Sequence, residues 1–362
     1  MYKYWLLLPL GLLLLIELGL RLFWANPYLL YAEPNPAFRL HEPGLLVYAR
    51  VDGDLYPGEH RIRFRIAPSR ALAGTAQEAR SGVLALGGST TECGLLPAGS
   101  RWPDLLARPA HNFGVSGNFS LDSYHNLQFL LETVQPVFDT VLLMHGVNDL
   151  GRFLARGLEE FEHWAPRPIT NVLVEADAVD QRLLPLLRVR DSALLSFIRY
   201  QSNNLKGRSF YRSLQLQRAA QEPLPELGAE TFEALRQRLT SELLPARRQV
   251  YRDLAQLSRE ANLRLLVLTQ PHAYGPGYRP EGPDLRLFPV YRGQRLSPAQ
   301  ASTVMDQING QTRTLAAELD LGLVDVTRCF AEGDPGPWFY DSVHYTPAGA
   351  ERFAACVDRH WD

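Results

Sequence analysis

Three short segments of the sequence combine residue types that acyl-transfer chemistry needs. The segments Gly87-Gly88-Ser89-Thr90 and Gly146-Val147-Asn148-Asp149 each follow a short apolar run. Near the C-terminus the chain reads Asp341-Ser342-Val343-His344. Hydrolysis by a serine requires a nucleophile, a base, a group that orients the base, and donors for the oxyanion. The sequence offers a candidate for each of these groups.

Ser89 is the candidate nucleophile. It follows two glycines at the end of the apolar run 83–86, and a helix that begins there would direct backbone N–H groups toward the serine oxygen. In isolation, a plain Gly-Ser turn is the simpler interpretation. A phosphate loop is disfavoured because no Gly-Lys-Ser/Thr follows. The Gly-x-Ser-x-Gly elbow is also absent, since this chain has Thr91 in place of the last glycine.

Asp341 and His344 are the candidate orienter and base. They are three residues apart, so on one helical turn or in a tight loop their side chains can face the same way. The alternative is a surface turn that precedes a helix beginning at Pro347. His272 and His145 are rival bases, because each follows an apolar strand.

Asn148 and Gly117 are the candidate oxyanion donors, together with the backbone N–H of Ser89. Each follows a predicted strand, where a carboxamide or an uncovered N–H can face a substrate. The alternatives are an asparagine that bonds its own turn and a glycine that only permits a left-handed turn. No His-Glu-x-x-His or Cys-x-x-Cys spacing occurs, so we expect no metal and no cofactor.

The elements around these residues follow an alternating α/β pattern. Short continuous apolar strands that alternate with helices indicate a parallel sheet covered on both faces. The candidate residues come after strand ends, which meet at one rim of a doubly wound sheet. We expect strands at 83–86, 111–113, 141–144, 265–268 and 321–326, and helices at 102–107, 121–133, 231–262, 298–319 and 347–360.

Two further regions surround this domain, which we expect to span 81–362. Residues 25–80 are a connector whose prolines exclude a long helix, and the polar–apolar alternation of 61–66 predicts an edge strand with its arginines in water. An insertion at about 152–225, after the third strand, is expected to be helical and to lie over the candidate residues.

Together the motifs resemble the SGNH or GDSL hydrolase superfamily. The resemblance covers about 81–150 and 262–360, and it departs from the family at Gly88, where the family has Asp. It implies a flavodoxin-like, doubly wound parallel sheet of five strands. The family's Gly-Asp-Ser, Gly, Gly-x-Asn-Asp and Asp-x-x-His blocks fall on 87–89, 112–117, 146–149 and 341–344. By this resemblance the catalytic residues are Ser89, Asp341 and His344, and the oxyanion hole is formed by Ser89, Gly117 and Asn148.

The N-terminal segment predicts a membrane anchor. Residues 5–24 are almost entirely apolar, broken only by Glu17 and Arg21, and about 20 such residues span a bilayer. Glu17 and Arg21 are four apart and can pair on one helix face. A cleaved signal peptide is the alternative, although no small-x-small cleavage site is clear. We expect a single-pass transmembrane helix within 1–24 and a domain outside the cytoplasm, in the periplasm or at the cell surface.

The bulk composition limits the partners. The chain of 362 residues has a formal net charge of −2, so no global field steers it toward nucleic acid. Three cysteines are too few for a disulfide scaffold. If the domain lies outside the cytoplasm, Cys329 and Cys356 can form a bridge; the sequence does not rank the bridged and free states of the three cysteines, Cys93 included.

These expectations lead to a substrate class and to two alternatives. The first expectation is hydrolysis of small acyl esters, above all acetyl esters on a cell-envelope glycan. A polysaccharide O-acetyltransferase would use the same triad with a sugar in place of water. A non-catalytic binding or assembly subunit of an envelope complex is the alternative from another class of protein.

Overall fold

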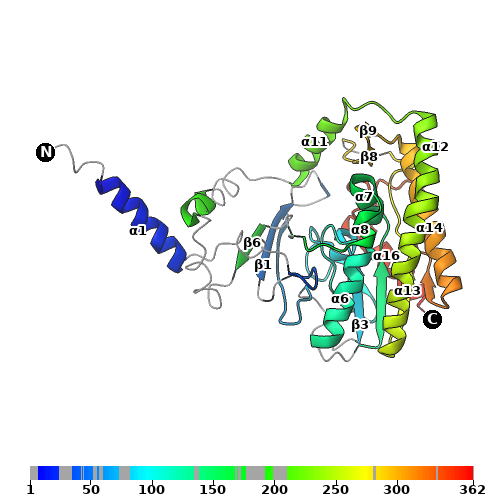
Figure 1. Ribbon diagram of the computed structural model, residues 1–362, viewed down its shortest axis with the longest axis horizontal. Coiled ribbons are helices and arrows are strands. Elements are labelled where there is room, and N and C mark those ends of the chain that lie inside the picture. The colour runs from blue at the N-terminus through cyan, green and yellow to red at the C-terminus, as the bar shows by residue number, and fades with distance from the viewer. Residues whose placement is uncertain are drawn as a thin grey trace.

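A parallel sheet of five strands lies among the helices of the α/β domain, where Figure 1 labels its strand β3 (Val83–Gly87) beside α6 (Ser120–Thr133). All neighbouring strands are parallel, and their order is β10-β7-β5-β3-β4. This is the flavodoxin-like order, in which the first strand lies between the second and the third. The predicted five-stranded sheet is therefore confirmed. Its strands are β3 (Val83–Gly87), β4 (Ala110–Asn112), β5 (Thr140–Met144), β7 (Arg264–Leu268) and β10 (Gly322–Val324).

The coordinates are those of a computed structural model. The residues that the structure describes are 7–23, 35–41, 43, 45–51, 55–56, 60–72, 82–133, 138–167, 169, 173–176, 192–198, 210–279, 283–331 and 333–361.

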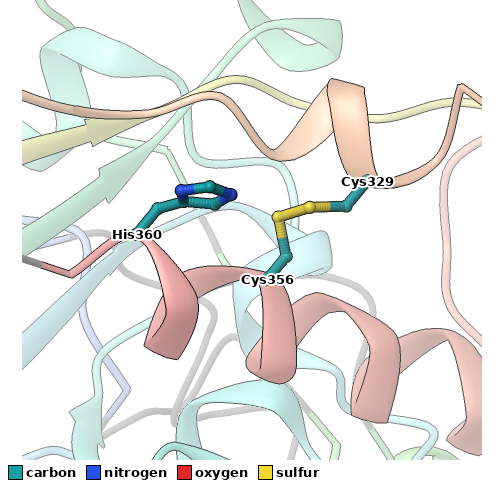
Figure 2. A group of neighbouring side chains, drawn as sticks. All are labelled: Cys329, Cys356 and His360. Atoms are coloured by element: carbon teal, nitrogen blue, oxygen red, sulfur yellow. A yellow bond between two sulfur atoms is a disulfide. The ribbon is translucent and has the colours of Figure 1, made fainter.

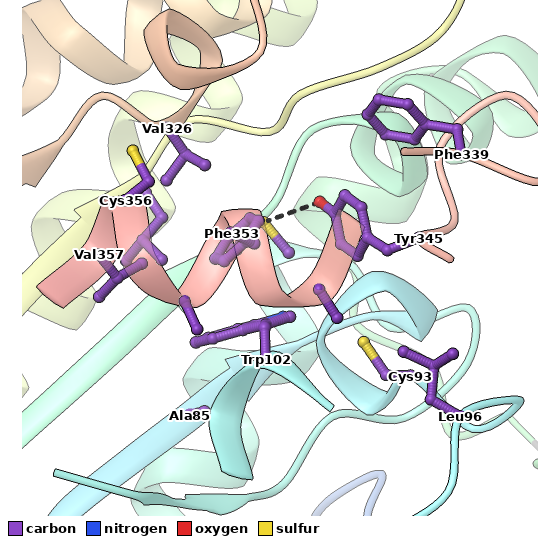
Figure 3. Packing of buried hydrophobic residues seen from close by; sticks show 14 of the residues in the cluster. Ala85, Cys93, Leu96, Trp102, Val326, Phe339, Tyr345, Phe353, Cys356 and Val357 are labelled. Atoms are coloured by element: carbon purple, nitrogen blue, oxygen red, sulfur yellow. Dashed lines mark hydrogen bonds between the residues drawn. The ribbon is translucent and has the colours of Figure 1, made fainter. Parts of the chain in front are cut away.

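Helices cover both faces of the sheet, because successive strand residues point to opposite sides. Val83 and Ala85 pack with α5 (Trp102–Leu105), α15 (Val326–Cys329) and α16 (Pro347–Arg359), and Figure 3 shows this cluster. On the other face, Leu84 and Leu86 pack in a cluster to which α6, α13 and α14 contribute. These three helices are α6 (Ser120–Thr133), α13 (Leu244–Glu260) and α14 (Pro298–Glu318).

The long helices begin and end close to the predicted positions. Ser297 and Gln300 form a capping box at the start of α14, and Thr346 caps α16 by accepting a hydrogen bond from the Gly349 N–H at 3.1 Å. The helix expected at 231–262 is a continuous run of α12 (Ala229–Arg238), η2 (Leu239–Leu243) and α13. The π-helical turn η2 in its middle was not predicted.

A second sheet joins the connector to the insertion. It is antiparallel, with the order β2-β1-β6. The edge strand predicted at 61–66 is β2 (His60–Arg65), with Ile62 buried; the side chains of its arginines lie outside the described part. The sequence predicted neither β1 (Leu45–Val51), which pairs with β2, nor β6 (Leu173–Ala176), which pairs with β1.

The insertion was expected to be helical, and the described part of it also contains the strand β6. Around β6 the structure has the helices α8 (Glu159–Glu162) and α11 (Phe210–Gln221), and α7 (Val147–Arg156) leads into the insertion. Farther along the chain, β8 (Val290–Tyr291) and β9 (Gln294–Arg295) form a short hairpin.

The N-terminal helix α1 (Leu7–Phe23) contains the expected Glu17–Arg21 ion pair, at 2.7 Å. Its 17 residues measure about 25 Å at the usual rise, against about 30 Å for the hydrocarbon core of a bilayer. Among the residues that the structure describes, no helix has both the length and the apolar character to cross a membrane. The transmembrane helix expected within 1–24 is therefore not found in the described residues. The described part of this segment is 7–23, without 1–6 and 24.

A disulfide between Cys329 and Cys356 ties α15 to α16 (Figure 2). The Cα atoms of the two cysteines are 6.1 Å apart, within the range of native disulfides. Cys93 is a free, buried cysteine. The structure therefore selects the bridge that the sequence left open.

Candidate active site

Ser89 lies at the turn between β3 and the short helix α4 (Ser89–Glu92). The carbonyl of Gly88 accepts the N–H groups of Thr91 at 3.0 Å and Glu92 at 2.9 Å, which closes the turn. A Cβ atom at position 88 would overlap the amide nitrogen of Asn148 and would lie 3.0 Å from the Asn118 carbonyl oxygen. The glycine that departs from the Gly-Asp-Ser pattern is therefore the residue that fits beside Asn148.

The structure brings Ser89, His344 and Asp341 together. Ser89 Oγ lies 2.7 Å from His344 Nε2, and His344 Nδ1 lies 2.7 Å from Asp341 Oδ2. The second oxygen of Asp341 accepts the backbone N–H groups of Val343 at 2.9 Å and His344 at 2.8 Å. The arrangement is that of a hydrolytic triad, in which the carboxylate fixes the ring and the ring faces the hydroxyl.

The electrostatics of the triad suit a histidine base. Burial lowers the pKa of His344, but the charge of Asp341 and its hydrogen bond outweigh burial, and the net pKa is raised. With Asp341 ionised, Nδ1 carries the proton and donates it to the carboxylate. Nε2 is then free to accept a proton from the Ser89 hydroxyl.

The three candidate oxyanion donors follow β3, β4 and β5: Ser89 begins α4, Gly117 lies in the loop after β4, and Asn148 lies in α7. The Asn148 amide, in the first turn of α7, donates to the Asn118 carbonyl oxygen at 2.7 Å. Gly117 has φ +78°, a left-handed conformation that favours glycine. Among the described residues, none accepts a hydrogen bond from the N–H of Ser89 or of Gly117. Both groups are thus available to a substrate oxygen.

Gln270, directly after β7, links two of the candidate loops. Its Oε1 accepts the N–H of Val147 at 2.8 Å, and its Nε2 donates to Thr90 Oγ1 at 3.1 Å. Asn309 pairs with both backbone groups of Gln270, at 2.8 Å and 3.0 Å. Sequence reasoning missed Gln270, although its position at a strand end was a usable signal.

A buried ion pair between Asp149 and Arg247 holds the segment that contains Asn148 in place. Asp149 accepts the Ser120 N–H at 2.8 Å, and its second oxygen lies 2.6 Å from Arg247 Nε. Both side chains of this pair are fully buried. Arg247 also donates to Gln311 Oε1 at 2.6 Å, which anchors α13 to α14. Nothing in the sequence around Arg247 marked it as the partner of Asp149.

The connector contributes two residues beneath the candidate site. His41 Nε2 lies 3.0 Å from Glu92 Oε1, and Ser116 donates to the other oxygen of Glu92. Burial raises the pKa of Glu92, but the hydrogen bonds from His41 and Ser116 outweigh it and the net pKa is lowered. Arg39 donates to the Ser116 carbonyl oxygen at 2.9 Å and to Asn118. Neither Arg39 nor His41 carried a sequence signal.

The rival bases lie elsewhere. His145 is buried and its Nε2 lies 2.7 Å from Ser123 Oγ; burial lowers its pKa to about 4. His272 Nε2 lies 3.6 Å from Asp306 Oδ1. Neither histidine forms a hydrogen bond with Ser89 in the described part of the chain, whereas His344 does.

One group of possible metal ligands occurs among the described residues. Atoms of Cys329, Cys356 and His360 lie within 4.8 Å of one another (Figure 2). The two sulfur atoms are bonded to each other, so neither is a thiolate ligand in this structure.

No protein-family model matches the chain, and no curated protein matches it. Similar solved structures include LAE5, an alpha/beta hydrolase enzyme from the metagenome of Lake Arreo, Spain, with a TM-score of 0.39 and 17% identity over 76% of this chain and 93% of that one. Another is Axe2, an acetylxylan esterase from Geobacillus stearothermophilus, with a TM-score of 0.40 and 16% identity over 77% and 92%. A member of the lipolytic protein G-D-S-L family from Veillonella parvula has a TM-score of 0.36 and 14% identity over 76% and 94%.

Proposed function

We propose that the protein is a serine esterase that cleaves small acyl esters, with acetyl esters as the preferred class. The observation that carries this proposal is the continuous hydrogen-bond chain from Asp341 through His344 to Ser89. A non-catalytic binding subunit would have no need of an aligned nucleophile, base and orienting carboxylate.

In the proposed mechanism, Ser89 Oγ attacks the ester carbonyl carbon while His344 Nε2 takes the hydroxyl proton. The carbonyl oxygen becomes an oxyanion, held by the N–H groups of Ser89 and Gly117 and by the Asn148 amide. When the carbon–oxygen bond to the alcohol breaks, His344 returns the proton to the leaving alcohol. Water, deprotonated by His344, then attacks the acyl carbon; the bond to Ser89 Oγ breaks, the acid is released, and His344 returns the proton to Ser89 Oγ.

The labelling test uses a fluorophosphonate probe, which reacts with activated serines. The wild type should be labelled and Ser89→Ala should not. Ser241→Ala is the matched control, because Ser241 is exposed on η2 and donates only to the Gln237 carbonyl oxygen among the described residues. An unlabelled wild type would overturn the esterase proposal and favour the binding subunit.

We further propose that the domain works outside the cytoplasm, associated with the membrane through its N-terminal segment and acting on an envelope glycan. The Cys329–Cys356 disulfide supports an oxidising compartment. The exposed apolar side chains of α1, among them Leu8, Leu14 and Phe23, support membrane association. Fractionation of cells should recover the protein in the membrane fraction with its bridge formed; recovery from the cytoplasmic fraction with three reduced thiols would contradict this location.

The acceptor is tested with the same protein. Release of free acetate from O-acetylated oligosaccharides, xylan fragments included, would identify water as the acceptor. If the donor instead loses its acetyl group only when a second, unacetylated glycan is added, and the acetyl group is then found on that glycan, the protein is an O-acetyltransferase.

A further inference from the structure

Two arginines meet at the glycine that is proposed to hold the oxyanion. A Cβ atom built on Gly117 would lie 3.7 Å from Arg39 Nη2 and 3.9 Å from Arg152 Nη2. Arg39 comes from the connector, and Arg152 from α7, one helical turn after Asn148. The proposed reacting carbonyl would therefore lie close to two guanidinium groups.

The nearby carboxylates already have other partners: Glu92 is held by His41 and Ser116, and Asp122 and Glu160 are held by other arginines. Asp122 pairs with Arg167, and its other oxygen accepts the indole N–H of Trp164 at 2.8 Å. Glu160 lies 3.3 Å from Arg156 Nε and 3.7 Å from Arg167 Nη1. These contacts leave the Gly117 side of the cluster with an excess of positive charge.

Arg152 is the member of this cluster that is open to a ligand. It is half-buried, and no hydrogen bond or ion pair joins it to another residue within the described ranges. Burial, followed by the charge of Arg167, lowers the pKa of Arg152, as expected for a cation in positive surroundings. The negative charge of an anion that entered this position would favour the charged form of Arg152 and so oppose both effects.

We propose that Arg152, with Arg39 behind it, binds a carboxylate of the substrate, so that the preferred ester is an acyl ester of an acidic sugar such as a uronate. The planar guanidinium matches a carboxylate with two parallel hydrogen bonds. Its place beside Gly117 puts that carboxylate on the same sugar unit as the ester, or on the next. This inference rests on the proposed esterase function, because Gly117 marks the reacting carbonyl only if Ser89 is the nucleophile.

The test compares two substrates that differ in one charge: an O-acetylated methyl galacturonoside and its methyl ester. The wild type should remove the acetyl group from the substrate with a free carboxylate (the acid) with a kcat/KM about tenfold or more above the value for the methyl ester. The reason is that a hydrogen bond to a charged group is worth about that factor. Arg152→Gln should remove this preference by raising the KM for the acid at least about tenfold more than the KM for the neutral methyl ester. Added salt should reduce the preference of the wild type.

Arg156→Gln is the matched control, because Arg156 lies one turn along α7, is exposed and faces Glu160. It should keep the preference, and Arg152→Lys should keep part of it. A second measurement does not depend on any variant: free galacturonate should protect the wild type from the fluorophosphonate probe better than its methyl ester does.

Three outcomes would overturn the inference. A labelled wild type without preference between the two substrates, and without selective protection by galacturonate, would refute the carboxylate site while leaving the esterase in place. An equal fall in kcat for both substrates in Arg152→Gln would mean that Arg152 stabilises the oxyanion instead. A wild type that is neither labelled nor active would refute the esterase proposal and this inference with it.

Discussion

The two oxygens of the Asp341 carboxylate have different partners. One accepts the backbone N–H groups of Val343 and His344, and the other holds the imidazole of His344. A spacing of three residues allows this. One carboxylate oxygen accepts the N–H groups of the turn that follows Asp341, and this turn places the His344 ring beside the other oxygen. At the scale of residues, the Asp-x-x-His segment is thus a nearly complete unit, which needs only a serine hydroxyl within hydrogen-bond distance of its ring.

The pH dependence of activity follows from the raised pKa of His344. Below that pKa the ring is protonated and cannot accept the Ser89 proton, so activity should rise with pH through a midpoint above the ordinary histidine value of about 6.5. Asp341→Asn removes the main cause of the increase and should move the midpoint down while lowering kcat. Profiles of kcat/KM against pH check both expectations, and an unshifted midpoint in the variant would contradict the assigned role of Asp341.

Asn148→Ala should lower kcat by about 10²–10³ with little change in KM, because an oxyanion donor acts mainly in the transition state. The variant should still react with the fluorophosphonate, though more slowly, since Ser89 and His344 are intact. A kcat equal to that of the wild type would remove Asn148 from the oxyanion hole.

Among the secondary-structure elements, the loops after four of the parallel strands supply and connect the nucleophile and the oxyanion donors, and Asp341 and His344 come after the fifth strand, β10. The loops after β3, β4 and β5 supply Ser89, Gly117 and Asn148, and Gln270 after β7 ties the first of these loops to the third. The carboxyl ends of parallel strands share one rim, so residues that are far apart in sequence become neighbours there.

Gly88→Ala tests how closely these loops are fitted. The added methyl group overlaps the Asn148 amide, so the loop after β5 must move and the oxyanion donor is displaced. We expect kcat to fall by about 10² or more, close to the effect of losing one donor. Gly151→Ala is the control, because a Cβ there meets nothing within 4 Å. It lies within α7 and should leave activity unchanged; equal activity of the two variants would show that the Gly88 contact has no catalytic role.

In the molecule as a whole, the connector and the C-terminal part of the domain both contact the site. From the connector, Arg39 binds the Ser116 carbonyl oxygen next to Gly117, and His41 binds Glu92 in the helix that begins at Ser89. At the other end, α16 follows directly after the Asp341–His344 turn, and the disulfide fixes this helix to α15. The bridge therefore stabilises the helix that directly follows the turn carrying the base.

Removing the bridge should lower the stability of the domain. Cys329 and Cys356 are 27 residues apart, so in the chain-entropy model their link is worth about 3–4 kcal/mol. The double variant Cys329→Ser/Cys356→Ser should lose about this much unfolding free energy while keeping activity at low temperature. Denatured wild type should show one free thiol before reduction and three after it; three free thiols without reduction would rule out the bridge.

Local sequence patterns were enough to predict the strands of the central sheet and most of its helices. This is because a strand or a helix is indicated by the spacing of apolar residues within a short stretch of the chain. It also placed Ser89, Asn148 and His344 at the ends of elements, where a shared rim could be inferred. The antiparallel sheet was missed, since β1 and β6 lie in segments without strong patterns and are paired across more than a hundred residues.

The contacts between distant side chains could not be predicted in this way, because they depend on the folded arrangement of the whole domain. Ser89 and His344 are separated by 255 positions, and of three candidate bases the fold brought this one to the hydroxyl. Arg39, Gln270 and Arg247 look ordinary in the sequence because their partners are chosen by the packing of distant segments. A pattern of residue types specifies an element, but a hydrogen bond between elements exists only once the whole core has fixed their distance and direction.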